Sequence, residues 1–153
     1  MLTVDLSFPE DLHFHIEHQV WARLNGDGTA VVGITSLGAR LAGEVYMCRP
    51  RAVGQAVEQG RSVAVVELAK SIVSVKSPVT GAVVAVNEAL ATRPELVFED
   101  PYGAGWLAQI RLNDFSADAP ALLHGEPVRA AMEHHAWLHR LEPDQPFSDI
   151  GPV

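Results

Sequence analysis

The chain has 153 residues, of which 48% are apolar and 20% are charged, and its formal net charge is −8. This length and balance are typical of one soluble globular domain that buries its own core. The acidic balance disfavours nucleic acids and anionic membrane surfaces as partners, because phosphate binding needs clustered Lys and Arg. No apolar run approaches the ~20 residues of a membrane-spanning helix, so we expect no membrane partner either.

The single cysteine and the N-terminal residues predict a cytoplasmic protein. Cys48 has no second cysteine with which to form an internal disulfide, which is typical of a reducing compartment. Residues 1–5 carry neither the basic start nor the apolar run of a secretory signal.

Short β-strands are expected at seven places, where Val, Ile or alternating apolar residues are bounded by turn residues. These places are residues 13–24, 29–34, 44–48 (stopped by Pro50), 61–69, 73–76, 82–87 and 106–112. Asn25-Gly-Asp-Gly28 predicts a hairpin turn, because Asn-Gly and Asp-Gly tolerate positive φ. Strands of this length and spacing favour an all-β domain.

Helical segments are few. Thr35 or Ser36 can cap a short helix over residues 37–41, which Gly43 ends. Residues 88–91 predict a helical turn that Arg93-Pro94 breaks. Residues 126–141 form the best helix, with Pro127 at its first position. Its apolar stripe is predicted to be Val128, Ala131, Met132, His135 and Leu138.

Three parts of the chain follow from this pattern. We expect a β-rich domain over residues 1–115, a linker and C-terminal helix packed on it over residues 116–142, and a tail over residues 143–153.

The two lysines stand out among the eleven cationic residues, because the other nine are Arg. Lys70 and Lys76 lie in one segment in which two Val-rich strands flank a short break, with Lys70 at the break. A lysine amine can be deprotonated and acylated, whereas an arginine stays charged. Acylation of a lysine side chain is therefore essentially restricted to this one segment. The two similar Val-rich strands on either side of Lys70 also favour a two-fold flattened barrel.

Five stretches in and around this segment carry a family resemblance. They are Asn25-Gly-Asp-Gly-Thr-Ala-Val-Val-Gly-Ile-Thr35, Val65-Val-Glu-Leu-Ala-Lys70, Ser77-Pro-Val-Thr-Gly-Ala-Val-Val-Ala-Val-Asn-Glu-Ala-Leu90, Pro94-Glu-Leu-Val97 and Asp100-Pro-Tyr-Gly-Ala-Gly-Trp106. In this order they resemble the glycine cleavage system H protein family over roughly residues 8–112. The first stretch is similar to the family's first hairpin, and the second and third to its lipoyl-bearing hairpin.

The resemblance implies a mainly β fold, a lipoyl-domain-like flattened barrel-sandwich hybrid with short helices and a C-terminal helix. It also implies lipoate in amide linkage on Lys70. The chain would then be a carrier and not an enzyme, and its swinging arm would bring bound intermediates to separate active sites at high effective concentration. The implied partners are a lipoate ligase or lipoyl transferase and dihydrolipoamide dehydrogenase. Glu67 either contributes to recognition of the hairpin by the attaching enzyme or is an ordinary solvent-facing carboxylate on the strand.

Four departures from the family pattern bear on the pathway. Glu67-Leu-Ala-Lys70-Ser replaces Glu-Ser-Val-Lys-Ala, and Ile72-Val-Ser-Val75 replaces a small polar and acidic stretch. His18-Gln-Val-Trp21 has one residue more than the usual His-Glu-Trp, and Met47-Cys-Arg-Pro50 replaces Val-Glu-Leu-Pro. These positions face partners and the resting arm. We therefore favour a lipoate-binding protein of heterodisulfide-reductase-like sulfur oxidation, with an aminomethyl carrier working with the glycine cleavage P and T proteins as the alternative.

Other candidate groups have simpler interpretations. His13, His15 and His18, and the i, i+4 pair His135 and His139, lack the further ligands of a zinc site, so we predict no metal. Cys48 is a candidate redox partner for the lipoyl disulfide, but a small buried strand residue is favoured. We expect Trp21, Trp106 and Trp137 to anchor the core, and Trp106 is also a candidate for the groove where the arm rests. No catalytic triad or phosphate-binding loop is visible.

Two other classes stay open. A biotinyl carrier uses the same fold, but its lysine usually lies in Met-Lys-Met, whereas here the sequence is Ala69-Lys70-Ser71. An unmodified interaction module is the second.

Overall fold

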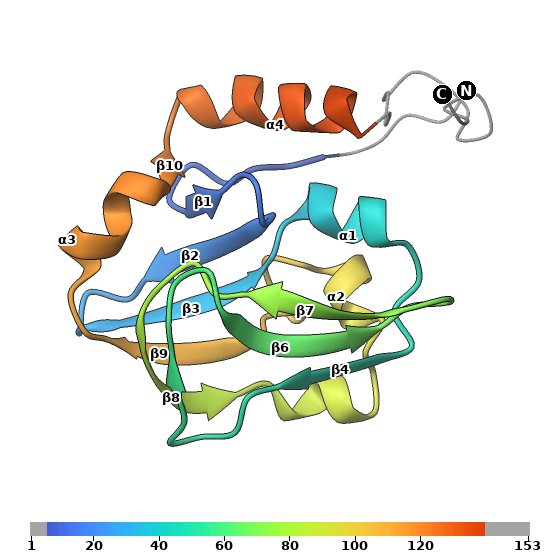
Figure 1. The fold of residues 1–153 in the computed structure, drawn as a ribbon, viewed down its shortest axis with the longest axis horizontal. Helices are drawn as coiled ribbons and strands as arrows, with labels where there is room; N and C mark the ends of the chain where they lie inside the picture. Colours follow the sequence, from blue (N-terminus) through green and yellow to red (C-terminus); the bar gives the residue numbers. More distant parts are fainter. Residues whose placement is uncertain (1–5, 140–153) are drawn as a thin grey trace.

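The computed structural model describes residues 6–139, and two β-sheets make up most of it (Figure 1). The larger sheet has seven strands in the order β10-β1-β2-β3-β9-β8-β5, and the smaller has three in the order β4-β6-β7. All neighbouring strands are antiparallel. The strands are β1 (His13–His15), β2 (Val20–Leu24), β3 (Thr29–Ile34), β4 (Met47–Pro50), β5 (Ala56–Val57), β6 (Ser62–Glu67), β7 (Ile72–Lys76), β8 (Gly81–Val86), β9 (Ala108–Leu112) and β10 (Leu123–His124).

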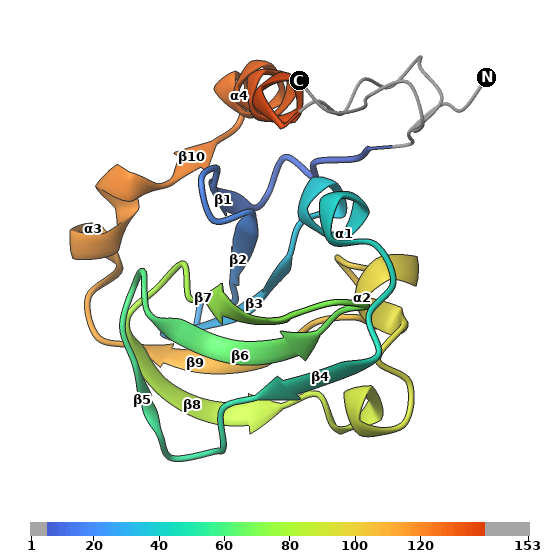
Figure 2. The same cartoon turned by 45° about the vertical axis from the view of Figure 1, so that its right-hand side comes forward.

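Short helices connect and cover the sheets. They are α1 (Ser36–Ala42), the 3-10 helix η1 (Glu88–Ala91), α2 (Leu96–Glu99), α3 (Phe115–Asp118), the 3-10 helix η2 (Ala119–Ala121) and the longest, α4 (Pro127–Leu138). Figure 2 shows the three-stranded sheet facing the β3–β9–β8 part of the larger sheet, with α4 next to β1 and β10. No helix within residues 6–139 is long and apolar enough to cross a membrane.

The main core fills the space between the two sheets. It is almost wholly aliphatic, with Val63 and Val66 from β6 facing Val32 from β3 and Ile110 from β9. Strict alternation is interrupted in β6, where the register shifts between Ser62 and Ala64, so that Val63 and Val66 are both buried although they are three residues apart. This core holds β6 and β7 in place behind the lysine turn.

A second core lies under α4. Phe14, Trp21, Leu37 and Met132 are at most 1% exposed there. Trp21 pairs with Gly33 across β2 and β3, and a Cβ added to Gly33 would lie 2.5 Å from Trp21 Cζ2. Only glycine therefore leaves room for the indole, which explains the Gly in the first hairpin.

The structure confirms the mainly β fold with short helices and a C-terminal helix. The helix after Thr35 is also confirmed: the Thr35 hydroxyl accepts a hydrogen bond from Gly38 N at 2.9 Å, and Gly43 follows α1 with φ of 81°. The predicted boundary of the domain at residue 115 stays a prediction, and the predicted tail lies outside the described residues.

Several predicted element boundaries were wrong. The expected strand over 13–24 is two strands, because the turn before β2 places Gln19 at a φ of 56°. The strand predicted over 44–48 starts at Met47 and includes Pro50, which β4 tolerates because it is an edge strand. The short helix α2 begins at Leu96, two residues after Pro94, and neither it nor β10 was predicted.

The buried face of α4 also differs from the predicted stripe. Ala136 is buried at 4% exposure, whereas Leu138 is 55% exposed and Trp137 is 62% exposed. Trp137 is therefore not a core anchor. Trp21 is fully buried, as predicted, and Trp106 is partly buried against the second core.

Candidate functional site

The turn between β6 and β7 presents Lys70 to solvent. Leu68 N donates a hydrogen bond to Ser71 O at 2.8 Å and closes the turn, with Ala69 and Lys70 at its tip. The last strand pair before the turn is Glu67 with Ile72. Because β6 pairs with β4 on one side and β7 on the other, the base of the turn is held by the sheet. Lys70 therefore projects from a turn whose base is fixed in the sheet.

Lys70 and Lys76 differ in their surroundings. Lys70 is exposed, and within residues 6–139 it makes no hydrogen bond or ion pair. Lys76 is half-buried on β7, where it pairs with Ser62. An attaching enzyme can reach the amine of Lys70 without breaking any contact. Glu67 is exposed at the end of β6, next to the turn, and its role in recognition stays a prediction.

Apolar side chains flank the lysine on β7. Ile72 is 68% exposed and Val73 is 40% exposed. These two residues belong to the stretch 72–75 that departs from the family pattern, and they place its first half on the surface beside the turn, whereas Val75 is buried.

A groove of about 210 Å³ runs from the lysine hairpin to α1 and the β1–β2 turn. Its walls are largely apolar, and its lining is His18, Gln19, Ile34, Gly38, Leu41, Ala42, Val66, Leu68, Val73, Ser74 and Val75. Leu68 and Val73 stand two and three residues from Lys70, so the mouth of the groove is next to the lysine. Trp106, the residue predicted as a possible lining residue, is not among them.

Three polar side chains line this groove, and one of them is fully engaged. Gln19 donates to Ile16 O at 2.6 Å and contacts Met132 Sδ at 3.3 Å, and its carbonyl accepts from the Thr35 hydroxyl. By contrast, His18 Nδ1 and Ser74 Oγ are buried and have no hydrogen-bond partner within the described residues. The lining contains no Asp, Glu, Lys or Arg.

Two polar side chains, Asn87 and Asp118, hold the family-like stretches in place. Asn87 Nδ2 donates to Ala104 O at 2.7 Å and to Trp106 O at 2.8 Å, which joins the end of β8 to the Gly-rich loop before β9. The Asp118 carboxylate accepts from Thr80 N at 2.7 Å and from the Thr80 hydroxyl at 3.0 Å, which holds the turn after β7 against α3. Sequence reasoning found the Asn87 and Thr80 motifs but not Asp118, which lies 38 residues away from its partner.

The histidines form pairs, not a metal site. The rings of His13 and His124 stack at 4.2 Å between centroids, as do those of His15 and His18. Burial and, second, the neighbouring imidazole lower the pKa of His13 and of His15. No group of three or more His, Cys, Asp or Glu in the described part of the chain could hold a metal ion.

Cys48 is 4% exposed on β4, as favoured from the sequence. Burial raises the pKa of its thiol to about 12, so the thiolate needed for disulfide exchange is scarce at neutral pH. This argues against a redox role for Cys48.

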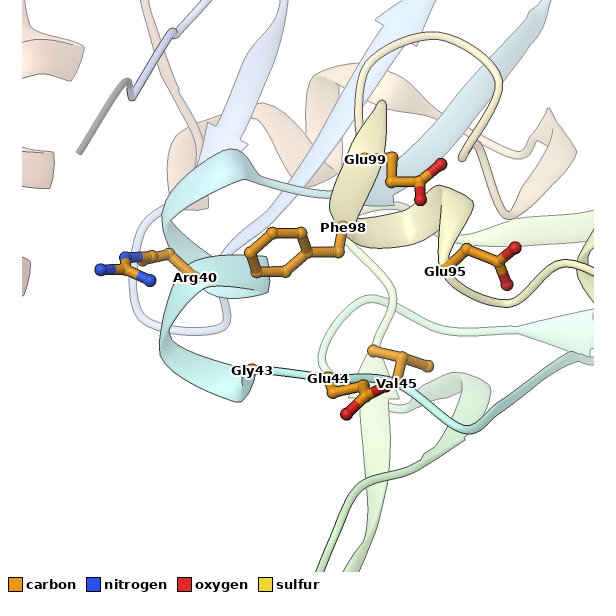
Figure 3. Close-up of a pocket in the computed structure, with 7 residues that line it drawn as sticks. All are labelled: Arg40, Gly43, Glu44, Val45, Glu95, Phe98 and Glu99. Atoms are coloured by element: carbon orange, nitrogen blue, oxygen red, sulfur yellow. The ribbon is translucent and has the colours of Figure 1, made fainter. Parts of the chain in front are cut away.

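A second cavity of about 270 Å³ lies between the end of α1 and α2 (Figure 3). Phe98 forms its apolar wall, and Glu44, Glu95 and Glu99 line it. Arg93 lies 3.5 Å from the carboxylates of Glu95 and Glu99. The cavity shares no lining residue with the groove beside Lys70, and we assign it no part in the site.

The structure thus places an exposed lysine, Lys70, on a turn whose base is fixed in the three-stranded sheet, with a largely apolar groove beside it. A family model described as "Glycine cleavage H-protein" matches residues 12–145. The chain belongs to the glycine cleavage H-protein family. Members of this family carry a lipoyl group in amide linkage on a lysine and are carriers, not catalysts.

Individual relatives agree with the family assignment. The "Glycine cleavage system H protein" of Mycobacterium avium is 40% identical over 127 residues, which are 81% of this chain and 96% of that protein. "Glycine cleavage system H protein 2" of Aquifex aeolicus is 40% identical over 118 residues, or 77% of this chain and 73% of that protein. The crystal structure of a glycine cleavage system H protein from Mycobacterium marinum superposes with a TM-score of 0.70 at 27% identity, and it covers 88% of this chain and 100% of its own.

These comparisons change the balance between the two pathways. The family model and all three relatives are described by glycine cleavage. The preference for sulfur oxidation, and for a heterodisulfide-reductase-like complex as partner, is therefore not supported. The alternative stated beside it is the better supported role.

Proposed function

We propose that this chain is the lipoyl carrier of a glycine cleavage system and that Lys70 bears the arm, which carries an aminomethyl group between partner enzymes. The observation that carries this proposal is the exposed, unpaired Lys70 on a turn whose base is fixed in the three-stranded sheet. Lipoate fits here, because the lysine amine is open to an attaching enzyme and an apolar groove begins beside it. The bound group supplies a dithiolane that accepts the aminomethyl fragment and is afterwards reoxidised by thiol exchange.

This chain's own residues support such an arm in two ways. The turn projects the lysine beyond the sheet, so the attached group can enter the active sites of separate enzymes. The apolar walls of the groove, including Leu68 and Val73, offer the arm a place to rest when no partner is bound. Partners would be the P and T proteins, dihydrolipoamide dehydrogenase, and a lipoate ligase or lipoyl transferase. The cytoplasmic location predicted from the sequence is part of the same proposal.

Two lysine variants test the proposal, because each is the other's control. The intact mass of the protein from its native host should show one lipoyl group, and a peptide map should place it on Lys70. Lys70→Arg should abolish both this mass gain and glycine-dependent exchange of carbon dioxide with P protein. Lys76→Arg should keep both. An unmodified Lys70 in cells that make lipoate, or exchange activity in the Lys70→Arg variant, would overturn the proposal.

A further inference from the structure

Six of the seven histidines form three stacked pairs at one seam of the molecule. The seam is the contact of β10 and α4 with β1 and the turn between β1 and β2. In each pair the ring centroids are 4.2 Å apart: His13 with His124, His15 with His18, and His135 with His139. An imidazole becomes a cation between about pH 8 and 5, and like charges this close disfavour each other. The seam is therefore the part of the chain whose charge changes most as the pH falls below neutral.

One of the pairs crosses the seam. His13 on β1 lies directly opposite His124 on β10, and the two rings are 15° from parallel. His124 Nδ1 also donates to Leu12 O at 2.9 Å. Because β10 is a two-residue strand at the edge of the seven-stranded sheet, it can leave β1 without breaking another strand pair. Positive charges on both rings would push β10 and β1 apart.

The turn between β1 and β2 depends on a neutral imidazole. His15 Nδ1 accepts a hydrogen bond from His18 N at 3.2 Å, and a protonated Nδ1 cannot accept one. Gln19, the next residue of the turn, contacts Met132 Sδ of α4 at 3.3 Å. Protonation of His15 thus removes a bond that shapes the turn on which α4 packs.

The helix α4 buries a histidine at the same seam. His135 is 9% exposed, and its ring lies against that of His139, one turn later. Burial first and the paired imidazole second lower the pKa of His135, as they also do for His13 and His15. The carboxylate of Glu17 raises the pKa of His15 and His135, but by less than either of these two causes lowers it. The closed seam therefore favours neutral rings.

Other charged groups at the seam do not change this balance. The remaining charged or titratable residues of β2, α1, α3 and α4 are Arg23, Arg40, Asp118, Arg129, Glu133 and His134. His134 lowers the pKa of His135, with the smallest effect of its four neighbours and surroundings. Arg129 pairs with Glu133 at 4.0 Å on the helix surface, and the Asp118 carboxylate binds Thr80.

We propose that residues 123–139, which comprise β10 and α4, form a pH-sensitive latch that opens as the histidine pairs become charged, while the two-sheet core stays folded. The main core contains no histidine among its described residues, and α4 contributes only to the second core. In both views α4 lies next to β1 and β10 and apart from the β6–β7 hairpin (Figure 1, Figure 2). The apolar side chains that α4 buries are Val128, Met132 and Ala136. A segment with so few buried apolar contacts opens before the sheets do.

The sign of the response follows from proton linkage. The closed latch lowers the pKa of its histidines, so their contribution to its stability is present above the unfolded value of about 6.5 and lost as the pH falls. A ring that titrates near pH 6.5 only in the open state makes opening about tenfold more favourable at pH 5.5 than at pH 7.5. Several such rings act in the same direction.

Amide hydrogen exchange of the full chain tests the latch, because it measures opening segment by segment. Exchange is followed at about pH 7.5 and about pH 5.5 in low concentrations of urea, and each protection factor is taken relative to an unstructured peptide at the same pH. The amides of α4 should exchange by an opening that hardly depends on urea, since little surface is exposed. Their protection should fall about tenfold or more on acidification. The amides of β6 and β9 should be protected at least about tenfold better at both pH values.

Four variants assign the response to the paired rings. His124→Gln combined with His135→Gln should reduce the fall at α4 at least about threefold, because glutamine can hydrogen-bond but does not titrate. His134→Gln makes the same change at an exposed ring on the same helix and should keep the full fall. Glu17→Gln should enlarge the fall about twofold, since it removes the carboxylate that favours charged His15 and His135. If the double variant does not fold, His124→Gln alone, at an exposed ring, should reduce the fall about twofold.

Three results would overturn the inference. The first is an α4 whose protection is the same at both pH values. The second is an α4 that exchanges with the protection and the urea dependence of β6 and β9, because it would then open only with the whole fold. The third is a full tenfold fall in the double variant, or in His124→Gln where only that variant folds. The test needs no group on Lys70, so its outcome is independent of the proposed carrier function.

Discussion

Replacing Asn87 tests how two of the family-like stretches, at the end of β8 and in the loop before β9, are held together. Its side chain is in a buried position, 7% exposed, at the end of β8. Its amide nitrogen donates to two carbonyls, Ala104 O and Trp106 O, and its amide oxygen accepts from Ala89 N at 3.2 Å. Asn87→Asp keeps the shape of the side chain but exchanges the donor for an oxygen. Two carbonyl oxygens would then face a carboxylate.

The expected cost follows from these contacts. Each lost neutral hydrogen bond removes about 1 kcal/mol, and an unsatisfied buried partner adds about 1–3 kcal/mol. An uncompensated buried charge costs about 3–5 kcal/mol by itself. Since these contributions overlap, we expect the free energy of unfolding of Asn87→Asp to be lower by about 3–5 kcal/mol at neutral pH.

The cost of Asn87→Asp should depend on pH with a definite sign. Burial and the facing carbonyls would raise the pKa of the new carboxyl in the folded state above the ~3.9 of an unfolded Asp. A raised folded pKa gives stability that is fully present below the unfolded value and lost as the pH rises through the folded value. The deficit of the variant should therefore be largest at neutral pH. It should narrow toward about pH 4, where a protonated Asp can donate to one of the two carbonyls.

Urea unfolding at a series of pH values measures this deficit. Asn113→Asp is the matched control, because it makes the same chemical change at an exposed position. A difference between the two variants below about 0.5 kcal/mol at neutral pH, the range of ordinary surface substitutions, would refute the reasoning. So would a deficit that stays constant with pH.

Three further predictions concern packing, a polar contact and pH. Gly33→Ala should lower the free energy of unfolding by about 1–3 kcal/mol in urea, because its Cβ would lie 2.5 Å from Trp21 Cζ2. Asp118→Ala should cost about 2–4 kcal/mol and speed amide hydrogen exchange at Thr80, whose N–H loses its acceptor. Burial lowers the folded pKa of His13, of His15 and of His135, so their contribution to stability is present above about pH 6.5 and lost as the pH falls. Urea midpoints at about pH 8 and 5.5 should show this loss, and His124→Gln should weaken it.

The parts of the fold that were predicted correctly depend on short-range signals. Asn25-Gly-Asp-Gly28 determines its turn by backbone conformation, with Gly26 and Gly28 at φ of 82° and 86°. Thr35 and Gly43 start and end α1 through contacts within a few residues. The lysine hairpin follows from two Val-rich strands whose inward residues share one core.

The errors arise where distant residues decide the local structure. Gln19 takes a positive φ in a turn where its side chain contacts Thr35 and Met132, which are 16 and 113 residues away. β10 is only two residues long and exists because Leu123 and His124 pair with β1 at the other end of the chain. Trp137 looked like a core residue by composition, but the rotation of α4 turns it outward. No periodicity within a short window contains this information.

The candidate site was found only in part for the same reason. Lys70 could be identified because its motif is continuous in sequence. The groove could not, since the β1–β2 turn, α1 and the lysine hairpin come together only in the fold. His18 and Ser74 both lie in stretches that depart from the family pattern. That departure drew attention to each stretch, but it could not show that both residues line the same groove. Asp118 had no local signal at all.

A carrier that serves several enzymes needs a weak hold on its own arm, and the groove has the chemistry for that. His18 Nδ1 and Ser74 Oγ are buried within the wall, so the groove offers the arm mainly apolar contact. The entropy of fixing the arm opposes this contact, and a partner can overcome the remaining hold with a few contacts of its own. A buried carboxylate paired with the amine would bind more strongly and release more slowly. The residues that line the groove from α1, β6 and β7 supply no such carboxylate. For the arm that we propose on Lys70, a groove lining without Asp, Glu, Lys or Arg therefore favours frequent release over tight protection of the cargo.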